Sequence, residues 1–214
     1  MGILSRLTEK PWLEPGLNRL SASDADGLRS LSAAAVGLRV YFGVATVMFL
    51  LIGAALVMRM GEHGLSSDQQ PDWKPMFWPP LLWLNTGVLI LSSAAWEWAR
   101  AAGRRGRMGS LRAGLIVGGV LALAFLVGQL TVWRQLEAAG CGFTATTMSA
   151  FFYLITALHG LHLLGGLAVW GRTTVKVLTG SEAAEVQQSV DLCTIYWHFL
   201  LLVWIVMFGL MLLT

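Results

Sequence analysis

Five long apolar stretches, separated by short polar segments, dominate the pattern of positions along the chain. They cover about residues 38–58, 79–99, 113–133, 148–171 and 191–213. Each has the length of about 20 residues that an α-helix needs to cross the hydrocarbon core of a bilayer. The pattern therefore predicts an all-α, polytopic membrane protein with five transmembrane helices in an up-and-down bundle.

The part before the first apolar stretch has a different character. Residues 1–34 contain several polar, charged and proline residues and no long apolar run. We expect a polar N-terminal arm there, with a short interfacial helix that begins at Ser23 or Asp24, because both residue types are common N-caps. Residues 35–214 are then the transmembrane domain.

The connections carry recognisable boundary signals. Trp73 and Trp78 lie in a proline-rich segment before the second stretch, where tryptophan typically marks a membrane interface. Pro79 and Pro80 follow, and proline is favoured in the first turn of a helix. We therefore expect the second helix to begin at these prolines.

Small residues predict one close helix contact. Gly114 and Gly118 lie four positions apart in the third stretch. This spacing places two glycines on one face of a helix and lets a neighbouring backbone approach.

Composition supports the membrane assignment, and the charges orient it. The chain is 56% hydrophobic and 13% charged, with a formal net charge of +3. Most lysines and arginines fall in the N-terminal arm and in the second and fourth connections, and positive residues favour the cytoplasmic side. The N-terminus is therefore predicted to be cytoplasmic and the C-terminus periplasmic. The positive charge is attributed to topology and anionic lipids, with no nucleic-acid partner expected.

The same topology separates the two cysteines. Cys141 falls in the outer third connection and Cys193 near the cytoplasmic end of the fifth helix. A disulfide requires Cα atoms within about 7 Å, so no internal disulfide is expected.

Three histidines are the first candidates for chemistry. His159 and His162 lie three residues apart in the fourth helix, and His198 lies in the fifth. The residues alone leave three interpretations open: haem or metal ligands, proton carriers, or hydrogen-bonded structural residues. A zinc-type or covalent-haem spacing is not present.

The acidic residues of the spans are few. Glu97 and Asp191 lie near the predicted cytoplasmic ends of the second and fifth helices, where water or Arg100 can solvate them. Motifs of serine hydrolases, zinc proteases and phosphate loops are not found in the sequence. No catalytic residue is therefore assigned.

Several motifs together resemble subunit III of haem-copper terminal oxidases, the cytochrome c oxidase subunit 3 family. They are "FFYLITALHGLHLLGGLAVW" (151–170), "IYWHFLLLVW" (195–204), "WPPLLWLNTGVLILSSAAWEWAR" (78–100) and "GQLTVWRQL" (128–136). The resemblance runs in family order from residue 38 to the end of the chain and fits the short, five-helix bacterial form. Two positions depart from it: Thr46 stands where many members carry a buried glutamate, and Leu201 where an aspartate is frequent.

The resemblance implies a non-catalytic subunit in the bacterial inner membrane. Such a subunit binds no haem, copper or other metal itself, packs against the haem- and copper-containing subunits I and II, and supports proton uptake. A small subunit IV is a further candidate partner, and phospholipid is the expected ligand. The histidines would then be buried hydrogen-bonding residues that fix the adjacent fourth and fifth helices. The residues assigned to structural, lipid or subunit contacts are His159, His162, Trp197, His198, Glu97, Asn85, Gln129 and Tyr153.

Other functions remain open at this point. The resemblance also fits the corresponding subunit of a quinol oxidase or of a nitric-oxide reductase system. A haem-b electron-transfer protein would use His162 and His198 as ligands, and a proton-conducting subunit would act through Glu97 and the histidines.

Overall fold

The computed structural model describes residues 22–65, 79–179 and 183–213. Within them the chain is all-helical, with five helices: α2 (Ala22–Leu65), α3 (Pro80–Arg104), α4 (Met108–Ala138), α5 (Thr147–Leu178) and α6 (Ala183–Leu212). Every predicted apolar stretch falls within one of these helices, apart from single residues at its ends. The prediction of an all-α chain with five long helices is confirmed.

The chain divides into two compact units, Met1–Tyr41 and Phe42–Thr214. Helix α2 passes from one unit into the other, so its first part is not the separate short helix that the sequence suggested. It begins at Ala22, one residue before the predicted N-cap. The remainder of the arm, and the loop that carries Trp73 and Trp78, lie outside the described residues.

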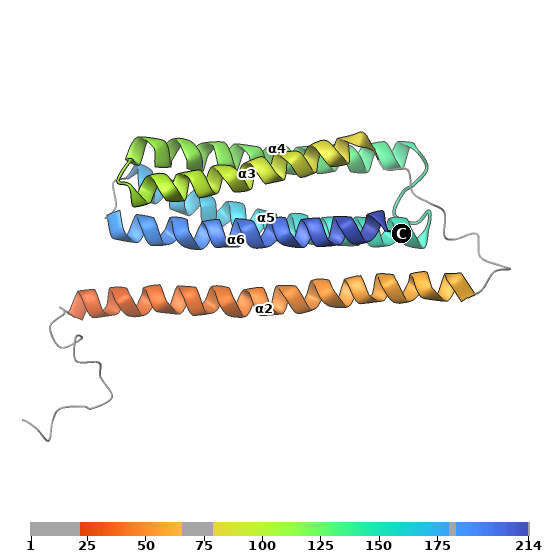
Figure 1. Cartoon of the computed structure of the whole chain (residues 1–214), viewed down its shortest axis with the longest axis horizontal. Helices are drawn as coiled ribbons and strands as arrows, with labels where there is room; N and C mark the ends of the chain where they lie inside the picture. Colours follow the sequence, from red (N-terminus) through yellow and green to blue (C-terminus); the bar gives the residue numbers. More distant parts are fainter. Residues whose placement is uncertain (1–21, 66–78, 180–182, 214) are drawn as a thin grey trace, which may run out of the picture. The chain divides into compact units, whose positions relative to one another are not determined.

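Four helices of the second unit form an antiparallel bundle. Helix α3 packs against α4 and α6, and α5 packs against the same two helices. Figure 1 shows α3, α4, α5 and α6 side by side, with successive helices running in opposite directions. The predicted adjacency of the fourth and fifth spans, which are α5 and α6, is confirmed.

Local sequence explains where the helices begin and turn. Helix α3 starts at Pro80, as predicted, with Pro79 in an extended conformation before it. Gly106 turns the chain between α3 and α4 with φ of 67°, a left-handed value that favours glycine. Helix α5 begins with a capping box, in which the Thr146 side chain accepts from Ser149 N and Ser149 Oγ accepts from Thr146 N.

Four helical segments are long and apolar enough to cross a membrane. They are Ala35–Arg59, Met108–Ala138, Thr147–Leu178 and Val186–Leu212, which belong to α2, α4, α5 and α6. Helix α3 is long enough but falls short in apolarity. Its polar side chains, including Asn85, Ser92 and Ser93, are buried against neighbouring helices and lower its hydropathy. The fifth predicted span is therefore not confirmed.

Candidate functional site

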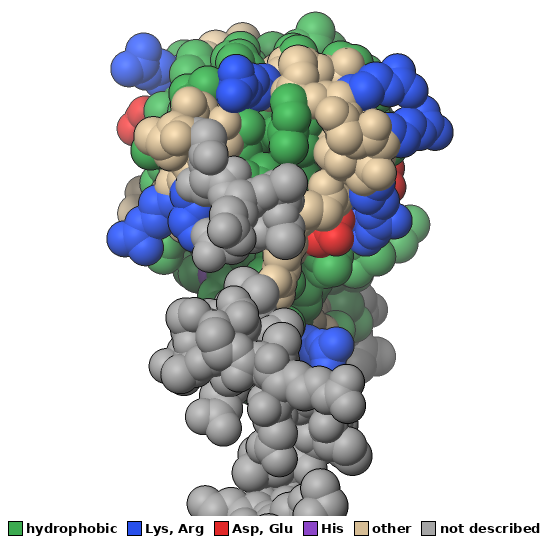
Figure 2. Space-filling view, turned by 90° about the vertical axis from the view of Figure 1, so that its left-hand side faces the viewer, with side chains coloured by type: hydrophobic (Ala, Val, Ile, Leu, Met, Phe, Trp, Pro, Cys, Tyr) green, Lys and Arg blue, Asp and Glu red, His purple; other side chains and the backbone are tan. Residues whose placement is uncertain are grey.

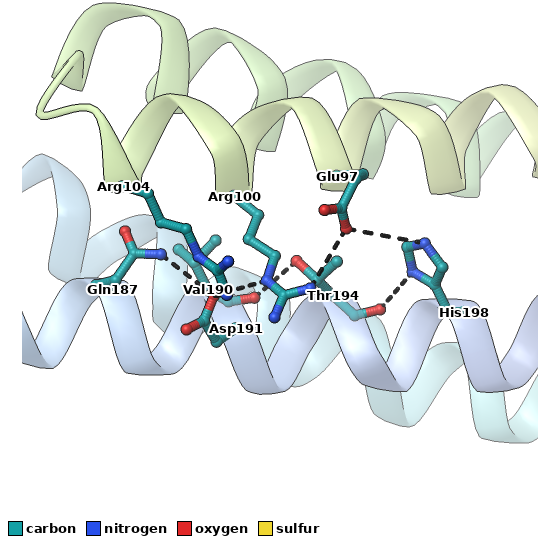
Figure 3. A network of polar contacts seen from close by, with 8 residues as sticks. All are labelled: Glu97, Arg100, Arg104, Gln187, Val190, Asp191, Thr194 and His198. Atoms are coloured by element: carbon teal, nitrogen blue, oxygen red, sulfur yellow. Dashed lines mark hydrogen bonds and ion pairs between the residues drawn. The ribbon is translucent and has the colours of Figure 1, made fainter.

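A charged network joins α3 to α6 near one end of the bundle (Figure 3). Arg100 Nε donates a hydrogen bond of 2.8 Å to Asp191 Oδ1, and Gln187 Nε2 donates one of 3.2 Å to the same oxygen. Arg104 Nη2 lies 3.6 Å from this oxygen as well. One carboxylate oxygen of α6 thus holds two arginines of α3.

Glu97 extends the network by one turn of α3. Its Oε2 lies 3.5 Å from Arg100 Nη1 and 4.0 Å from His198 Nε2. The side chains of Glu97 and His198 are 53% and 48% exposed, whereas Arg100 is 24% exposed. The network therefore runs from a half-buried ion pair to a carboxylate and an imidazole that are open to the surroundings.

The charge of Arg100 is secured by this arrangement. Arg100 follows the apolar part of α3, and its hydrogen bond to Asp191 raises the pKa of the guanidinium above the ordinary value. The nearby carboxylates act in the same direction, so Arg100 stays protonated and Asp191 has a permanent partner.

The same end of the bundle carries most of the exposed positive charge of the described helices. Figure 2 shows lysine and arginine side chains around this end, with acidic side chains between them. The exposed basic residues here are Arg104, Arg105, Arg107, Arg112, Arg172 and Lys176. They come from the connection between α3 and α4, from the start of α4 and from the last turns of α5.

The resemblance implies that the histidines fix α5 to α6, and the structure shows ring hydrogen bonds of two of them within single helices. His162 Nδ1 pairs with Leu158 O and His198 Nδ1 pairs with Thr194 O, each in its own helix. His159 is buried, and neither of its ring nitrogens has a hydrogen-bond partner among the described residues. His198 is half exposed, so it is not a core residue. The helix periodicity could not reveal these partners, because they depend on side-chain rotamers.

A tyrosine makes one of the direct hydrogen bonds between α5 and α6, in addition to the 3.7 Å contact of Thr173 Oγ1 with Cys193 Sγ. Tyr196 Oη donates to the backbone carbonyl of His162 at 2.7 Å. A Cβ atom at Gly166 would lie 2.6 Å from the Tyr196 ring, so this glycine creates the space that the tyrosine occupies. Trp197, the next residue, stacks on Trp96 of α3 with ring centroids 5.5 Å apart.

Helices α3 and α4 meet through glycines, as predicted from Gly114 and Gly118. A Cβ at Gly114 would lie 2.7 Å from the Ala99 Cβ, and one at Gly118 would lie 2.9 Å from Trp96 Nε1. Ser92 Oγ donates a 2.8 Å hydrogen bond to Gly118 O across the same seam. The predicted close approach is confirmed.

The remaining predicted contact residues also join helices. Asn85 Nδ2 donates to Gln129 Oε1 at 3.5 Å, which links α3 to α4. Tyr153 Oη donates to Trp133 O at 3.2 Å, which links α5 to α4. These three side chains therefore hold the bundle together.

Two further links were not anticipated from sequence. Trp170 Nε1 donates to Leu115 O at 2.9 Å and its ring lies against Gly119, while Trp204 Nε1 donates to Thr86 Oγ1 at 3.1 Å. The adjacent Gly118 and Gly119 could have indicated the contact with Trp170, because two successive glycines leave space on two sides of α4.

The described residues contain no group of three or more histidine, cysteine, aspartate or glutamate side chains that could hold a metal ion. Cys141 and Cys193 are both free thiols. The polar side chains described above either form hydrogen bonds between helices or belong to the charged network at one end of the bundle.

Together, the apolar helices and their interhelical polar contacts define a polytopic α-helical membrane protein. Residues 73–213 match the family model described as cytochrome c oxidase subunit III. The chain belongs to this family, as its motifs indicated.

Individual relatives agree with the family match. A probable cytochrome c oxidase subunit 3 of Mycobacterium leprae is 32% identical over 142 residues, covering 61% of this chain and 68% of the relative. Cytochrome c oxidase subunit 3 of Synechocystis is 31% identical over 182 residues, covering 78% and 72%. Subunit 3 of the cytochrome bo(3) ubiquinol oxidase of Pseudomonas aeruginosa is 28% identical over 138 residues, covering 64% and 66%. Other mycobacterial relatives are matched over 61% of their own length.

Proposed function

We propose that this chain is the non-catalytic subunit III of a proton-pumping haem-copper oxidase, which oxidises cytochrome c and reduces oxygen to water in aerobic respiration. The observation that carries the proposal is the family match over residues 73–213. Haem and copper belong to the partner subunits in this proposal, and subunits I and II and a small subunit IV are the expected partners.

A quinol oxidase is the second candidate. The similarity to subunit 3 of the Pseudomonas aeruginosa ubiquinol oxidase favours it, since that protein covers 64% of the chain and the Mycobacterium leprae relative covers 61%. The electron donor is determined by other subunits, so both candidates assign this chain the same structural task.

We place the protein in a bacterial inner membrane with five spans. The basic end of the bundle supports a cytoplasmic position for the connection between α3 and α4, because positive residues are retained on that side. This orientation puts the N-terminus in the cytoplasm and the C-terminus in the periplasm. In the assembled complex α3 is the fifth span, since its buried polar groups face other helices and not lipid.

Stabilisation of subunit I and lipid binding are the tasks that the surface supports. Large apolar side chains cover the outer faces of several helices, among them Leu50 and Leu51 of α2 and Val120 and Val127 of α4. Acyl chains or partner helices would cover these faces, and the exposed arginines at the basic end would pair with lipid phosphates.

Support of proton uptake is assigned to the open part of the charged network. Glu97 and His198 are exposed, titratable and adjacent at the proposed cytoplasmic end. A Glu97→Gln enzyme should still assemble but should reduce oxygen more slowly, because the reduction of oxygen to water consumes the protons whose uptake is slowed. Glu137→Gln, in the last turn of α4 and at the other end of the bundle, is the matched control. Equal proton uptake in both variants would contradict this role.

The main test is purification of the tagged chain in mild detergent, followed by mass spectrometry and an absorption spectrum. We expect subunits I and II to accompany the chain, with the haem spectrum lost when harsher detergent removes them. A coloured isolated chain would refute the proposal and would favour a haem-b protein. A quinone- or cytochrome c-dependent oxygen uptake assay of the purified complex distinguishes the two oxidase types.

A further inference from the structure

A buried polar cluster in the middle of the bundle has hydrogen-bonding groups that find no partner among the described residues. Asn85 Nδ2 of α3 donates to Phe125 O at 3.4 Å and to Gln129 Oε1 at 3.5 Å, both on α4. Asn85 is 1% exposed and Gln129 is 4% exposed. The cluster is therefore shielded from the surroundings of the bundle.

The orientation of both amides follows from these contacts. Only the nitrogen of Asn85 can face the Phe125 carbonyl, because two oxygens would repel each other. The Gln129 atom next to this nitrogen must then be the oxygen. The Gln129 amide nitrogen consequently points away from Asn85, and it has no partner among the described residues.

His159 of α5 contacts the side chain of Phe125, whose backbone carbonyl belongs to this cluster. Its ring is 5.9 Å from the Phe125 ring and 5.0 Å from the Trp204 ring, measured between centroids. The residue is 1% exposed, and both ring nitrogens lack partners within the described part of the chain. A neutral imidazole thus presents one donor and one acceptor to an otherwise apolar setting.

Helix geometry places Gln129 on the face of α4 that meets α5. Gln129 follows Phe125 by four residues, so it lies about one turn along the same face of α4. Helices α4 and α5 are antiparallel and in contact, and Trp133, one turn further, donates to Thr156 of α5 at 3.0 Å. Gln129 therefore lies between Phe125, which contacts His159, and Trp133, which contacts Thr156.

Leaving these groups unpaired would be costly. An unsatisfied buried polar group loses the hydrogen bonds that water would give it, and inside a bilayer no bulk water can replace them. Water is the small neutral molecule that accepts from an amide and donates to an imidazole nitrogen at once, and buried waters typically satisfy such orphaned groups. A charged ligand fits less well, because the cluster contains no carboxylate, lysine or arginine.

We propose that a buried water molecule between α4 and α5 accepts a hydrogen bond from Gln129 Nε2 and donates one to the unprotonated ring nitrogen of His159. This site goes beyond the proposed function. It is formed by side chains of this chain alone, so it does not depend on which type of oxidase the chain belongs to. Its consequence is that His159 is a hydrated residue inside the membrane.

Water-edited solid-state NMR tests this site in the purified full chain with its accompanying subunits, reconstituted in lipid bilayers. Nitrogen-15 labelling of histidine reports on the rings, and the His159 signals are assigned by their loss in His159→Phe. We expect rapid magnetisation transfer from water to the His159 ring, comparable with that seen for the exposed His198, because a bound water would be adjacent to the ring.

Gln129→Leu should reduce this transfer several-fold, because it removes the donor that holds the water. Gln135→Leu, at an exposed position of α4, is the matched control and should leave the transfer unchanged. A wild-type ring without transfer overturns the proposal, and so does undiminished transfer in a folded Gln129→Leu protein.

A cryo-EM map at a resolution that shows ordered water provides an independent test that needs no variant. We expect density for a water molecule between Gln129 and His159. Continuous side-chain packing there overturns the proposal.

Discussion

Replacing Gly114 by alanine should loosen the contact between α3 and α4, although alanine favours a helix more than glycine does. The added Cβ would lie 2.7 Å from the Cβ, 2.9 Å from the Cα and 3.1 Å from the N of Ala99. Two of these atoms belong to the backbone, so no side-chain rotation can relieve the collision. The helices must separate, and that loosens the neighbouring contacts along the seam.

The two opposing contributions can be compared. Alanine improves the helix propensity by about 1 kcal/mol, whereas overpacking a close contact typically costs about 1–3 kcal/mol. Separation of the helices also weakens the bond from Ser92 Oγ to Gly118 O. We expect a net loss of about 1–2 kcal/mol, which corresponds to a decrease of about 2–8 °C in the melting temperature.

Thermal unfolding in detergent measures this loss through the buried thiol of Cys193, which is 3% exposed. A thiol-reactive fluorophore reports its exposure, in a background where Cys141→Ser removes the half-buried second thiol. Gly109→Ala is the matched control on the same helix, because a Cβ there meets no atom within 4 Å. If Gly114→Ala melts at or above the temperature of the parent protein, the inferred steric limit is wrong.

Two further predictions concern the polar links. Asp191→Asn removes the charge that Arg100 contacts at 2.8 Å. Because the pair is only partly buried, we expect the free energy of unfolding to fall by about 1–2 kcal/mol, between the values for exposed and buried pairs. The same thermal assay measures it, and an unchanged midpoint at low and high salt would show that the pair contributes nothing. Tyr196→Phe removes the 2.7 Å hydrogen bond to His162 O and should cost about 0.6 kcal/mol. A double variant with Asp191→Asn should give additive losses, and strong non-additivity would mean that the two contacts are coupled.

The sequence contained enough information for the helices but not for all of their partners. The apolar stretches and the prolines at 79 and 80 predicted where helices lie and where one begins, because both depend on local composition. The spacing of Gly114 and Gly118 predicted a close approach, because small residues on one face leave room for a neighbour. The partner Ala99 was not predictable, since it depends on how α3 is rotated and shifted along α4.

The histidines show the corresponding limit for the site. Their spacing correctly placed two imidazoles in one helix, and only the family resemblance implied that they fix α5 to α6 by hydrogen bonds. Among the described residues, Tyr196 donates a hydrogen bond from α6 to α5, and the ring nitrogens of His159 have no hydrogen-bond partner. Ring partners depend on rotamers and on the other helices, which no local pattern specifies.

The modest apolarity of α3 has a consequence for how the protein enters its membrane. In a five-span topology, a segment with Asn85, Ser92 and Glu97 is a poor substrate for insertion by itself, because polar and charged side chains oppose partitioning into lipid. Its partner α4 is strongly apolar and supplies acceptors for Asn85 and Ser92. The two helices are joined by a tight turn at Gly106. We therefore expect α3 to leave the translocon together with α4 as a preformed hairpin, after both have been synthesised.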